Sequence, residues 1–96
     1  MADLQYIKLG DLEIHDRLAA LKAWSMADGK LTKTYSFQAY MDGVEFAAKV
    51  GKEADYLNHH PDILIGWRKV TVSVNTHDVD GISPYDFELA RLIDLI

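Results

Sequence analysis

The apolar residues of this chain change their spacing once, near its middle, and this change constrains the fold more than any other feature. Between residues 37 and 57 they recur at steps of three and four, which indicates a helix with one buried face. The stripe consists of Phe37, Tyr40, Val44, Ala47, Val50, Ala54 and Leu57. Between residues 69 and 76 they alternate instead, as in an antiparallel strand with one covered face. Both elements must bury one side, so the pattern predicts helices packed on a sheet.

Signals at both ends delimit the central helix. Ser36 is suited to cap its start. Asn58 tolerates the left-handed conformation of a helix end, and the proline three residues further on forbids continuation, so we expect the helix to end near Leu57. Gly43 and Gly51 lower the helix propensity, which means that packing must stabilise this helix. The same glycines could let a neighbouring backbone approach closely.

The remaining segments complete an alternating series of helices and strands. We predict a helix over 11–22, strands over 24–26 and 30–35 joined by an Asp28-Gly29 turn, and a final helix after Asp80-Gly81. Residues 62–66 and 69–76 are expected to form two strands or one bent strand. Ser83, Pro84 and Asp86 form the pattern of a capping box with proline at the first helical position. The order αββαββα predicts one α+β domain over residues 1–96, built as a two-layer sandwich.

Composition excludes several classes of protein. The 96 residues include 15 acidic and 10 basic ones, for a net charge of −5, which argues against nucleic acid as a partner. No stretch approaches the roughly 20 apolar residues of a membrane span, and the first residues lack the basic start and apolar run of a secretion signal, so we expect a cytoplasmic protein without a membrane partner. The absence of cysteine excludes disulfides, thiolate metal sites and a cysteine nucleophile.

Three histidines stand at the ends of predicted elements. His59 and His60 precede the strand over 62–66, and His77 follows the strand over 69–76 on its polar side. If these two strands form a hairpin, its open ends meet and bring the three imidazoles together. The unperturbed pKa of histidine, about 6.5, suits proton transfer near neutral pH. The sequence therefore favours acid–base chemistry at this end of the sheet.

Other interpretations of these histidines remain open. His59 and His60 could be a solvated pair near a helix C-terminus, where a cation interacts well with the helix dipole. His77 could be a turn residue, and Asp86 only a helix cap. A three-histidine zinc site is a further alternative. Neighbouring residues rarely point the same way, however, so we expect no metal.

Two tryptophans and a fourth histidine complete the candidates. Trp24 could belong to the core or to the wall of a pocket for a flat ligand. Trp67, at the predicted hairpin turn, is expected to be exposed or at an interface, and His15 to be solvated on the first helix.

From Trp24 to its end, the chain resembles the pterin-4a-carbinolamine dehydratases. The shared features include Trp24, Tyr35, Phe37, Tyr40, Phe46, Leu57, His59-His60-Pro61-Asp62-Ile63, Lys69-Val70-Thr71-Val72, Thr76-His77, Gly81-Ile82-Ser83, Asp86 and Leu89-Ala90. The resemblance implies three helices on one face of a four-stranded antiparallel sheet. It also implies dehydration of 4a-hydroxytetrahydropterin, which aromatic amino acid hydroxylases form, to quinonoid dihydropterin, as in tetrahydrobiopterin recycling.

The resemblance also implies roles for individual residues. His59 and His77 would be the proton-transfer pair, and His60 would mainly bind and orient the pterin, although the division between His59 and His60 stays open. Asp86 would hydrogen-bond an imidazole and select its tautomer, and Trp24 would line the pocket. No metal or cofactor would be needed, because the pterin is the substrate.

Some positions depart from the family pattern. Asp55 stands where glutamate is usual, so its contact with the pocket could be shortened or lost. Tyr85 replaces a commonly basic residue, and Gly43 and Gly51 replace alanines. The alternative function is a non-catalytic interaction module, either a dimerisation cofactor or an assembly chaperone, on the same fold. A core this small also favours self-association, and the resemblance implies a homodimer or homotetramer.

Overall fold

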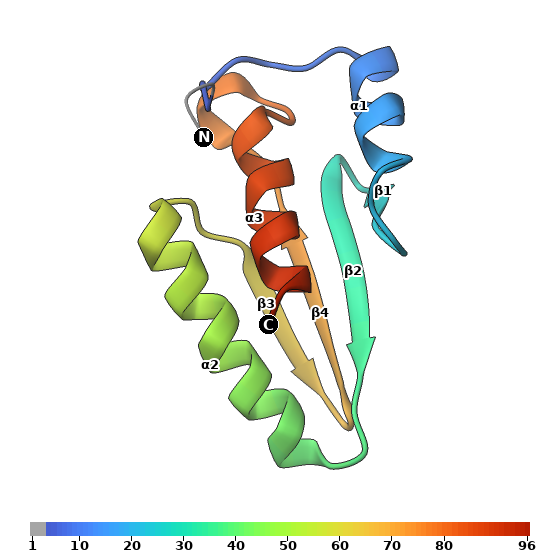
Figure 1. The fold of residues 1–96 in the computed structure, drawn as a ribbon, viewed down its shortest axis with the longest axis vertical. Helices are drawn as coiled ribbons and strands as arrows, with labels where there is room; N and C mark the ends of the chain where they lie inside the picture. The colour runs from blue at the N-terminus through green and yellow to red at the C-terminus, as the bar shows by residue number, and fades with distance from the viewer. Residues whose placement is uncertain (1–3) are drawn as a thin grey trace.

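The computed structural model of this protein describes residues 4–96 and contains one four-stranded antiparallel sheet with three α-helices (Figure 1). The elements are α1 (Asp11–Leu18), β1 (Ser25–Ala27), β2 (Lys30–Ser36), α2 (Tyr40–Leu57), β3 (Asp62–Gly66), β4 (Lys69–Val74), a short 3-10 helix η1 (His77–Val79) and α3 (Pro84–Asp94). In Figure 1, α2 and α3 lie side by side over one face of the sheet, and α1 lies beside β1. The predicted α+β fold is confirmed.

The strand order β1-β2-β4-β3 places β4 in the middle of the sheet. Along β4, Val70, Val72 and Val74 are buried, whereas Thr71 and Ser73 between them are partly exposed, as the alternation predicted. Leu31 on β2 lies opposite Val74 and is also completely buried. The core therefore lies between this face of the sheet and the helices.

The central helix begins later than predicted. Ser36 does not cap it, because Ser36 remains in β2 opposite Lys69, and the Phe37 amide donates to the Arg68 carbonyl at 2.9 Å. The helix starts at Tyr40 after Ala39, without a side-chain cap. Strand pairing thus outweighed the local capping signal. Its end is as predicted, with Asn58 left-handed at φ 52°.

The buried face of α2 is rotated slightly from the predicted stripe. Its buried residues are Gly43, Phe46, Ala47, Val50 and Ala54. Tyr40 was expected to be buried but is about half exposed, since it is the first helical residue. At Gly43 it is side chains, and not a neighbouring backbone as expected, that approach closely: a Cβ there would lie 3.2 Å from a methyl group of Val70. No atom lies within 4 Å of such a Cβ at Gly51.

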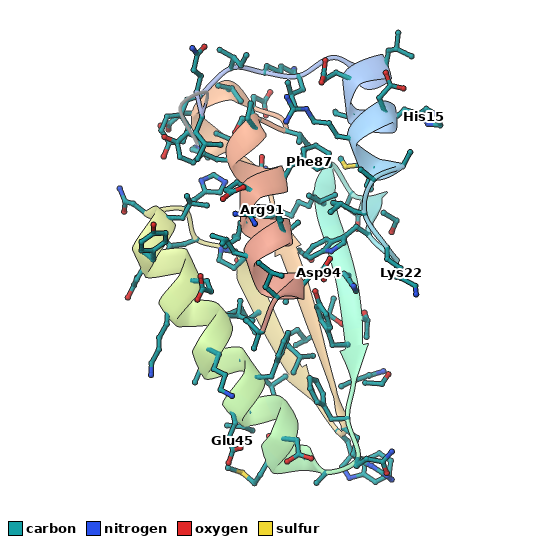
Figure 2. The ribbon with its side chains drawn as sticks, viewed as in Figure 1. His15, Lys22, Glu45, Phe87, Arg91 and Asp94 are labelled. Carbon is teal, nitrogen blue, oxygen red and sulfur yellow. The ribbon has the colours of Figure 1, made fainter. Side chains whose placement is uncertain are left out.

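Other predicted elements also differ at their ends, and β2 extends by one residue to Ser36. The first helix ends at Leu18 rather than at residue 22, and the chain then turns through Ala23, which has φ 66°. The strand expected over 24–26 covers 25–27, and β4 ends at Val74, so Thr76 only bridges Gly81. Figure 2 shows His15 on the outer side of α1, where it is exposed as expected. Within residues 4–96, no helix is long and apolar enough to cross a membrane.

Candidate active site

The β3–β4 hairpin brings the three predicted histidines to one pocket. The strands pair from Asp62 opposite Ser73 to Gly66 opposite Lys69, so the open ends of the hairpin meet beside the end of α2. A pocket of about 320 Å³ lies at this place. Its lining residues are Tyr6, Asn58, His59, His60, Asn75, Thr76, His77 and Asp78. The expectation that the hairpin brings the three imidazoles together is therefore met.

His59 is held by a buried carboxylate. Its Nε2 lies 2.6 Å from Oδ1 of Asp86, and both side chains are almost completely enclosed, with His59 8% exposed and Asp86 0%. An ionised carboxylate can only accept, so Nε2 of His59 carries a proton and donates it in this bond; when the imidazole is neutral, Nδ1 is the nitrogen left as an acceptor. Asp86 thus lies where the resemblance implied, beside an imidazole.

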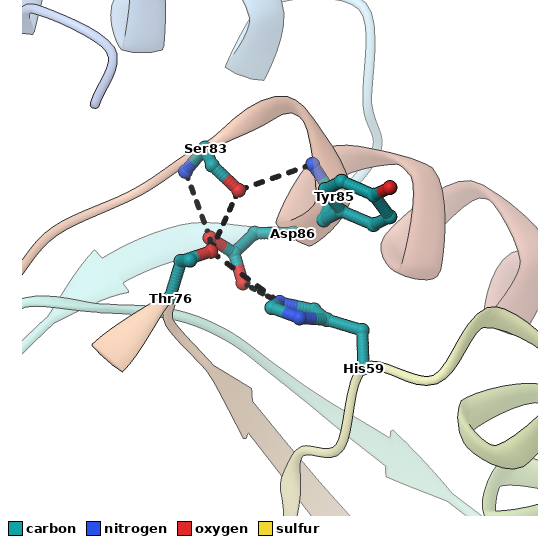
Figure 3. A network of polar contacts seen from close by, with 5 residues as sticks. All are labelled: His59, Thr76, Ser83, Tyr85 and Asp86. Carbon is teal, nitrogen blue, oxygen red and sulfur yellow. Dashed lines mark hydrogen bonds and ion pairs between the residues drawn. The ribbon is translucent and has the colours of Figure 1, made fainter. Parts of the chain in front are cut away.

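A hydrogen-bonded chain of hydroxyls fixes Asp86 (Figure 3). Oδ2 of Asp86 accepts from the Thr76 hydroxyl at 2.7 Å and from the Ser83 amide at 2.9 Å. The Thr76 oxygen also lies 2.6 Å from the Ser83 hydroxyl. Thr76 has a single proton, which it gives to Asp86, so Ser83 donates to Thr76. Among residues 4–96, no buried side-chain nitrogen or oxygen lacks a partner, and the network is complete.

The same residues form the beginning of α3. Ser83 caps the helix by accepting from the Tyr85 amide at 3.2 Å, and the Ser83 amide donates to the Asp86 carboxylate. Pro84 occupies the first helical position. The Asp86 carboxylate therefore has two roles: its Oδ2 takes part in the capping box, and its Oδ1 contacts His59.

His60 and His77 differ from His59 in their exposure to solvent. His60 Nε2 lies 2.9 Å from Oδ1 of Asp55, and the His60 side chain is 57% exposed. The shorter Asp55 side chain therefore keeps a contact at the pocket. His77 begins the 3-10 helix after β4 and is also exposed. Both rings can exchange protons with a bound molecule or with water.

Trp24 does not lie where the resemblance implied. It is buried in the core, its ring makes an edge contact with Tyr35, and its indole N–H donates to Asp94 at 3.0 Å. It is not among the residues that line the histidine pocket. Trp24, which was expected to line the pocket, is thus a core residue, because α3 brings Asp94 to its indole.

Sequence reasoning missed the N-terminal contribution to the pocket. Tyr6 lines it, and the ring of Tyr6 stacks on that of Tyr85. Burial raises the pKa of Tyr6, and the neighbouring Tyr85 and Asp78 raise it further, so this phenol stays neutral. Thr76, Asn75, Asn58 and Asp78 were also not singled out as lining residues. A tyrosine in an irregular segment carries no periodic signal that could have revealed this position.

No metal centre is evident at the pocket. In the part of the chain that the structure describes, no three histidine, aspartate or glutamate side chains are grouped so that they could hold a metal ion. The pairing of His59 with Asp86 and of His60 with Asp55 accounts for one nitrogen of each ring. The arrangement is one of proton donors and acceptors.

Sequence comparison assigns the family. The family model described as pterin 4 alpha carbinolamine dehydratase matches residues 7–96. The chain belongs to the pterin-4a-carbinolamine dehydratase family. Two curated relatives, from Roseiflexus sp. (strain RS-1) and Sulfurisphaera tokodaii, are both named "Putative pterin-4-alpha-carbinolamine dehydratase". They are 40% and 42% identical to this chain over 89 and 87 residues, covering 93% and 91% of it and 96% and 94% of the relatives.

Two solved structures share the fold of this chain. A transcriptional coactivator/pterin dehydratase from Brucella melitensis superposes with a TM-score of 0.86 at 27% identity, over 93% of this chain and 97% of that one. A pterin dehydratase-like protein identified as a RuBisCO assembly factor in the alpha-carboxysome gives 0.64 at 17% identity, over 77% and 88%. At that identity the second likeness concerns the fold alone.

Proposed function

We propose that this protein dehydrates the 4a-carbinolamine of a tetrahydropterin to quinonoid dihydropterin and water. The observation that carries this proposal is the pocket itself, in which three imidazoles meet and one of them is bonded to a buried carboxylate, in a member of this family. In the reaction the C4a–O bond breaks, the proton on N5 leaves, and a C4a–N5 double bond forms. The chemistry needs one acid and one base.

The two tasks match two different histidine environments. We assign the base to His59, since Asp86 occupies its Nε2 and leaves Nδ1 to accept the N5 proton. Asp86 also stabilises the imidazolium that this transfer forms. We assign the acid to His77, which also lines the pocket, is exposed and can protonate the leaving oxygen.

His60 is suited to bind and orient the substrate. Its ring lies at the pocket, and its Nε2 contacts Asp55, which leaves Nδ1 to contact a substrate. We propose Asp55 and Asp86 as residues that orient imidazoles around the pterin. Trp24 was expected to line the wall of the substrate pocket, and we propose that Tyr6 does so instead.

Dehydratase assays on histidine variants test this proposal. His77→Ala combined with His59→Gln should lower kcat/KM by a factor of about 10²–10⁴, the usual contribution of general acid–base catalysis. Glutamine is chosen at position 59 because its amide N–H can still donate to Asp86, whereas alanine would leave a buried carboxylate oxygen without a partner. His15→Ala, on the outer side of α1, is the control and should keep wild-type activity. A double variant with the wild-type rate overturns the assignment.

Removal of metal should not affect the activity. We propose that the reaction needs no metal or cofactor, because proton transfer by imidazoles completes it. We therefore expect the same rate before and after exhaustive chelation, with no stoichiometric zinc in elemental analysis. Activity that is lost on chelation and restored by zinc would support a metal site instead.

A non-catalytic interaction module is the second candidate. Large apolar side chains are exposed on the surface of the described chain, among them Leu64 at 70% and Trp67 at 73%, and such groups often mark contact sites. The Brucella structure is itself described as a coactivator as well as a pterin dehydratase. Wild-type protein that fails to accelerate dehydration, yet binds a protein partner through these residues, would favour the module.

A further inference from the structure

The segment before α1 crosses over the beginning of α3 and is fixed there. The amide of Leu9 donates to the carbonyl of Ile82 at 2.7 Å, and the Leu9 side chain is buried. The aliphatic part of Lys8 lies against Gly81, where an added Cβ would be only 2.9 Å from Cε of Lys8. These contacts place the residues just before them, Tyr6 among them, over the histidine pocket.

Tyr6 and Tyr85 form a stacked pair beside His59. Their ring centroids lie 4.0 Å apart and their planes differ by only 9°, which is the geometry of close parallel stacking. The His59 ring is 6.2 Å from the ring of Tyr6 and 5.6 Å from that of Tyr85, and it is tilted against both. The pair thus stands next to the imidazole to which we assign the base.

The helix start holds Tyr85 in place. Its amide donates to the capping hydroxyl of Ser83, and Pro84 precedes it. Figure 3 shows the Tyr85 ring above that of His59 at the beginning of α3. Tyr6 lines the pocket, whereas Tyr85 does not. Since Tyr85 covers one face of the Tyr6 ring, only the other face of that ring is free to stack on a molecule bound in the pocket.

We propose that Tyr6 is a substrate-binding residue that stacks on the flat ring of a bicyclic pterin, and that Tyr85 positions it. This inference rests on the proposed function and deepens it, because it names the group that recognises the ring. In the 4a-carbinolamine the bridgehead C4a is tetrahedral, but the other, conjugated atoms of the pyrimidine half stay nearly coplanar, and aromatic rings favour offset stacking on such a surface. A ligand in the pocket would extend the Tyr85–Tyr6 stack by one ring, with its reacting edge towards the histidines.

Kinetics distinguish binding from proton transfer. Tyr6→Leu keeps apolar area but removes the ring, so we expect KM for the 4a-carbinolamine to rise roughly 2- to 13-fold with kcat little changed. Tyr6→Phe should stay near wild type. Tyr85→Ala should raise KM in the same direction, and Tyr85→Phe should restore it, because the phenylalanine ring still supports Tyr6. Tyr40→Leu is the matched control, since Tyr40 is 47% exposed against 46% for Tyr6 and lies outside the pocket.

Direct binding of oxidised biopterin, followed by its fluorescence, separates this inference from the proposed function. Tyr6→Leu should weaken biopterin binding by the same factor as it raises KM, with circular dichroism unchanged. Equal affinity in wild type and Tyr6→Leu overturns the stacking role even if the protein is a dehydratase. Binding that depends on Tyr6 in a wild-type protein without turnover would support the stacking role and overturn the function. A wild-type protein that binds no pterin overturns both.

Discussion

At the scale of single residues, the site depends on how Asp86 is satisfied. This carboxylate is completely buried, yet each oxygen has a donor, from His59 on one side and from Thr76 and the Ser83 amide on the other. Burying a polar group without a partner costs free energy, whereas a complete network orients its members. The orientation of the His59 ring is therefore linked to the hydroxyl of Thr76, which donates to Asp86 and lies 3.4 Å from Nε2 of His59.

Removal of this hydroxyl should be costly. Thr76→Val preserves shape but takes the donor from Asp86 and the acceptor from Ser83, so we expect the free energy of unfolding to fall by about 1–3 kcal/mol. Thr34→Val is the matched control, because the Thr34 hydroxyl contacts Thr71 on the exposed face of the sheet and should change stability by less than about 0.5 kcal/mol. Urea denaturation measures both. Equal effects would show that the network contributes nothing beyond a surface contact.

At the scale of elements, α2 contains two glycines in opposite environments. Gly43 allows Val70 of β4 and Phe37 to approach the helix, whereas space is open beside Gly51. Helix propensity alone favours alanine over glycine by about 1 kcal/mol in both places. The difference in free energy of unfolding between the alanine variants at these two positions therefore measures packing against the sheet.

Alanine substitution should separate propensity from packing. Gly51→Ala is expected to raise the free energy of unfolding by about 0.4–1 kcal/mol. Gly43→Ala should gain less or lose stability, because its Cβ would lie 3.2 Å from Val70 and this buried side chain has little room to move. Thermal or urea unfolding of both variants tests the comparison. A Gly43→Ala protein stabilised as much as Gly51→Ala would contradict the close packing.

The other end of α3 is tied to the sheet by Asp94, which Figure 2 labels. Its carboxylate accepts from Trp24 at 3.0 Å, from Lys33 at 2.9 Å and from the Tyr35 hydroxyl. Burial by itself raises the pKa of Asp94, but these hydrogen bonds outweigh it and hold the pKa below the ordinary value. The ionised form is thus the one that the fold favours.

This linkage predicts how stability depends on pH. A carboxyl whose folded-state pKa is lowered stabilises the fold above its unfolded value of about 3.9, and the contribution is lost as pH falls through the folded-state pKa. We expect wild type to be more stable than Asp94→Asn near neutral pH and the difference to shrink below about pH 4. Asp16→Asn, on the exposed side of α1, should show no such change. A difference that is constant with pH would contradict this interpretation.

At the scale of the whole molecule, the sheet ends in an edge strand with apolar side chains. β3 lies at the border of the sheet and exposes Leu64 and Ile65, and the adjoining turn exposes Trp67. Unpaired edges of this kind favour pairing with another chain. We therefore propose that the protein self-associates, as a homodimer or homotetramer.

Sedimentation at micromolar concentration tests self-association. We expect species larger than the 10.9 kDa chain, and Leu64→Lys, at a side chain that is 70% exposed, should shift the distribution towards the monomer. Leu12→Lys is the control, since Leu12 is 76% exposed on α1, away from this edge. A wild-type protein that sediments as a single 10.9 kDa species refutes the proposal.

The sequence by itself determined those features whose cause lies within a few residues. The capping box at Ser83, the left-handed Asn58 and the alternation along β4 were all predicted, because caps, turns and strand periodicity depend on near neighbours. The meeting of the histidines followed from one further step, the hairpin between β3 and β4. Strands that follow each other in the sequence usually pair, so this hairpin could be predicted.

Only the tertiary structure decided where distant segments meet. Ser36 had a capping signal but joined β2, because pairing with β4 satisfied its backbone. Trp24 went to the core since its indole reaches Asp94, a residue 70 positions further on. Tyr6 came to the pocket because the N-terminal segment pairs with Ile82 beside α3. Such contacts depend on the packing of whole elements, and no local pattern of residues records which of them will form.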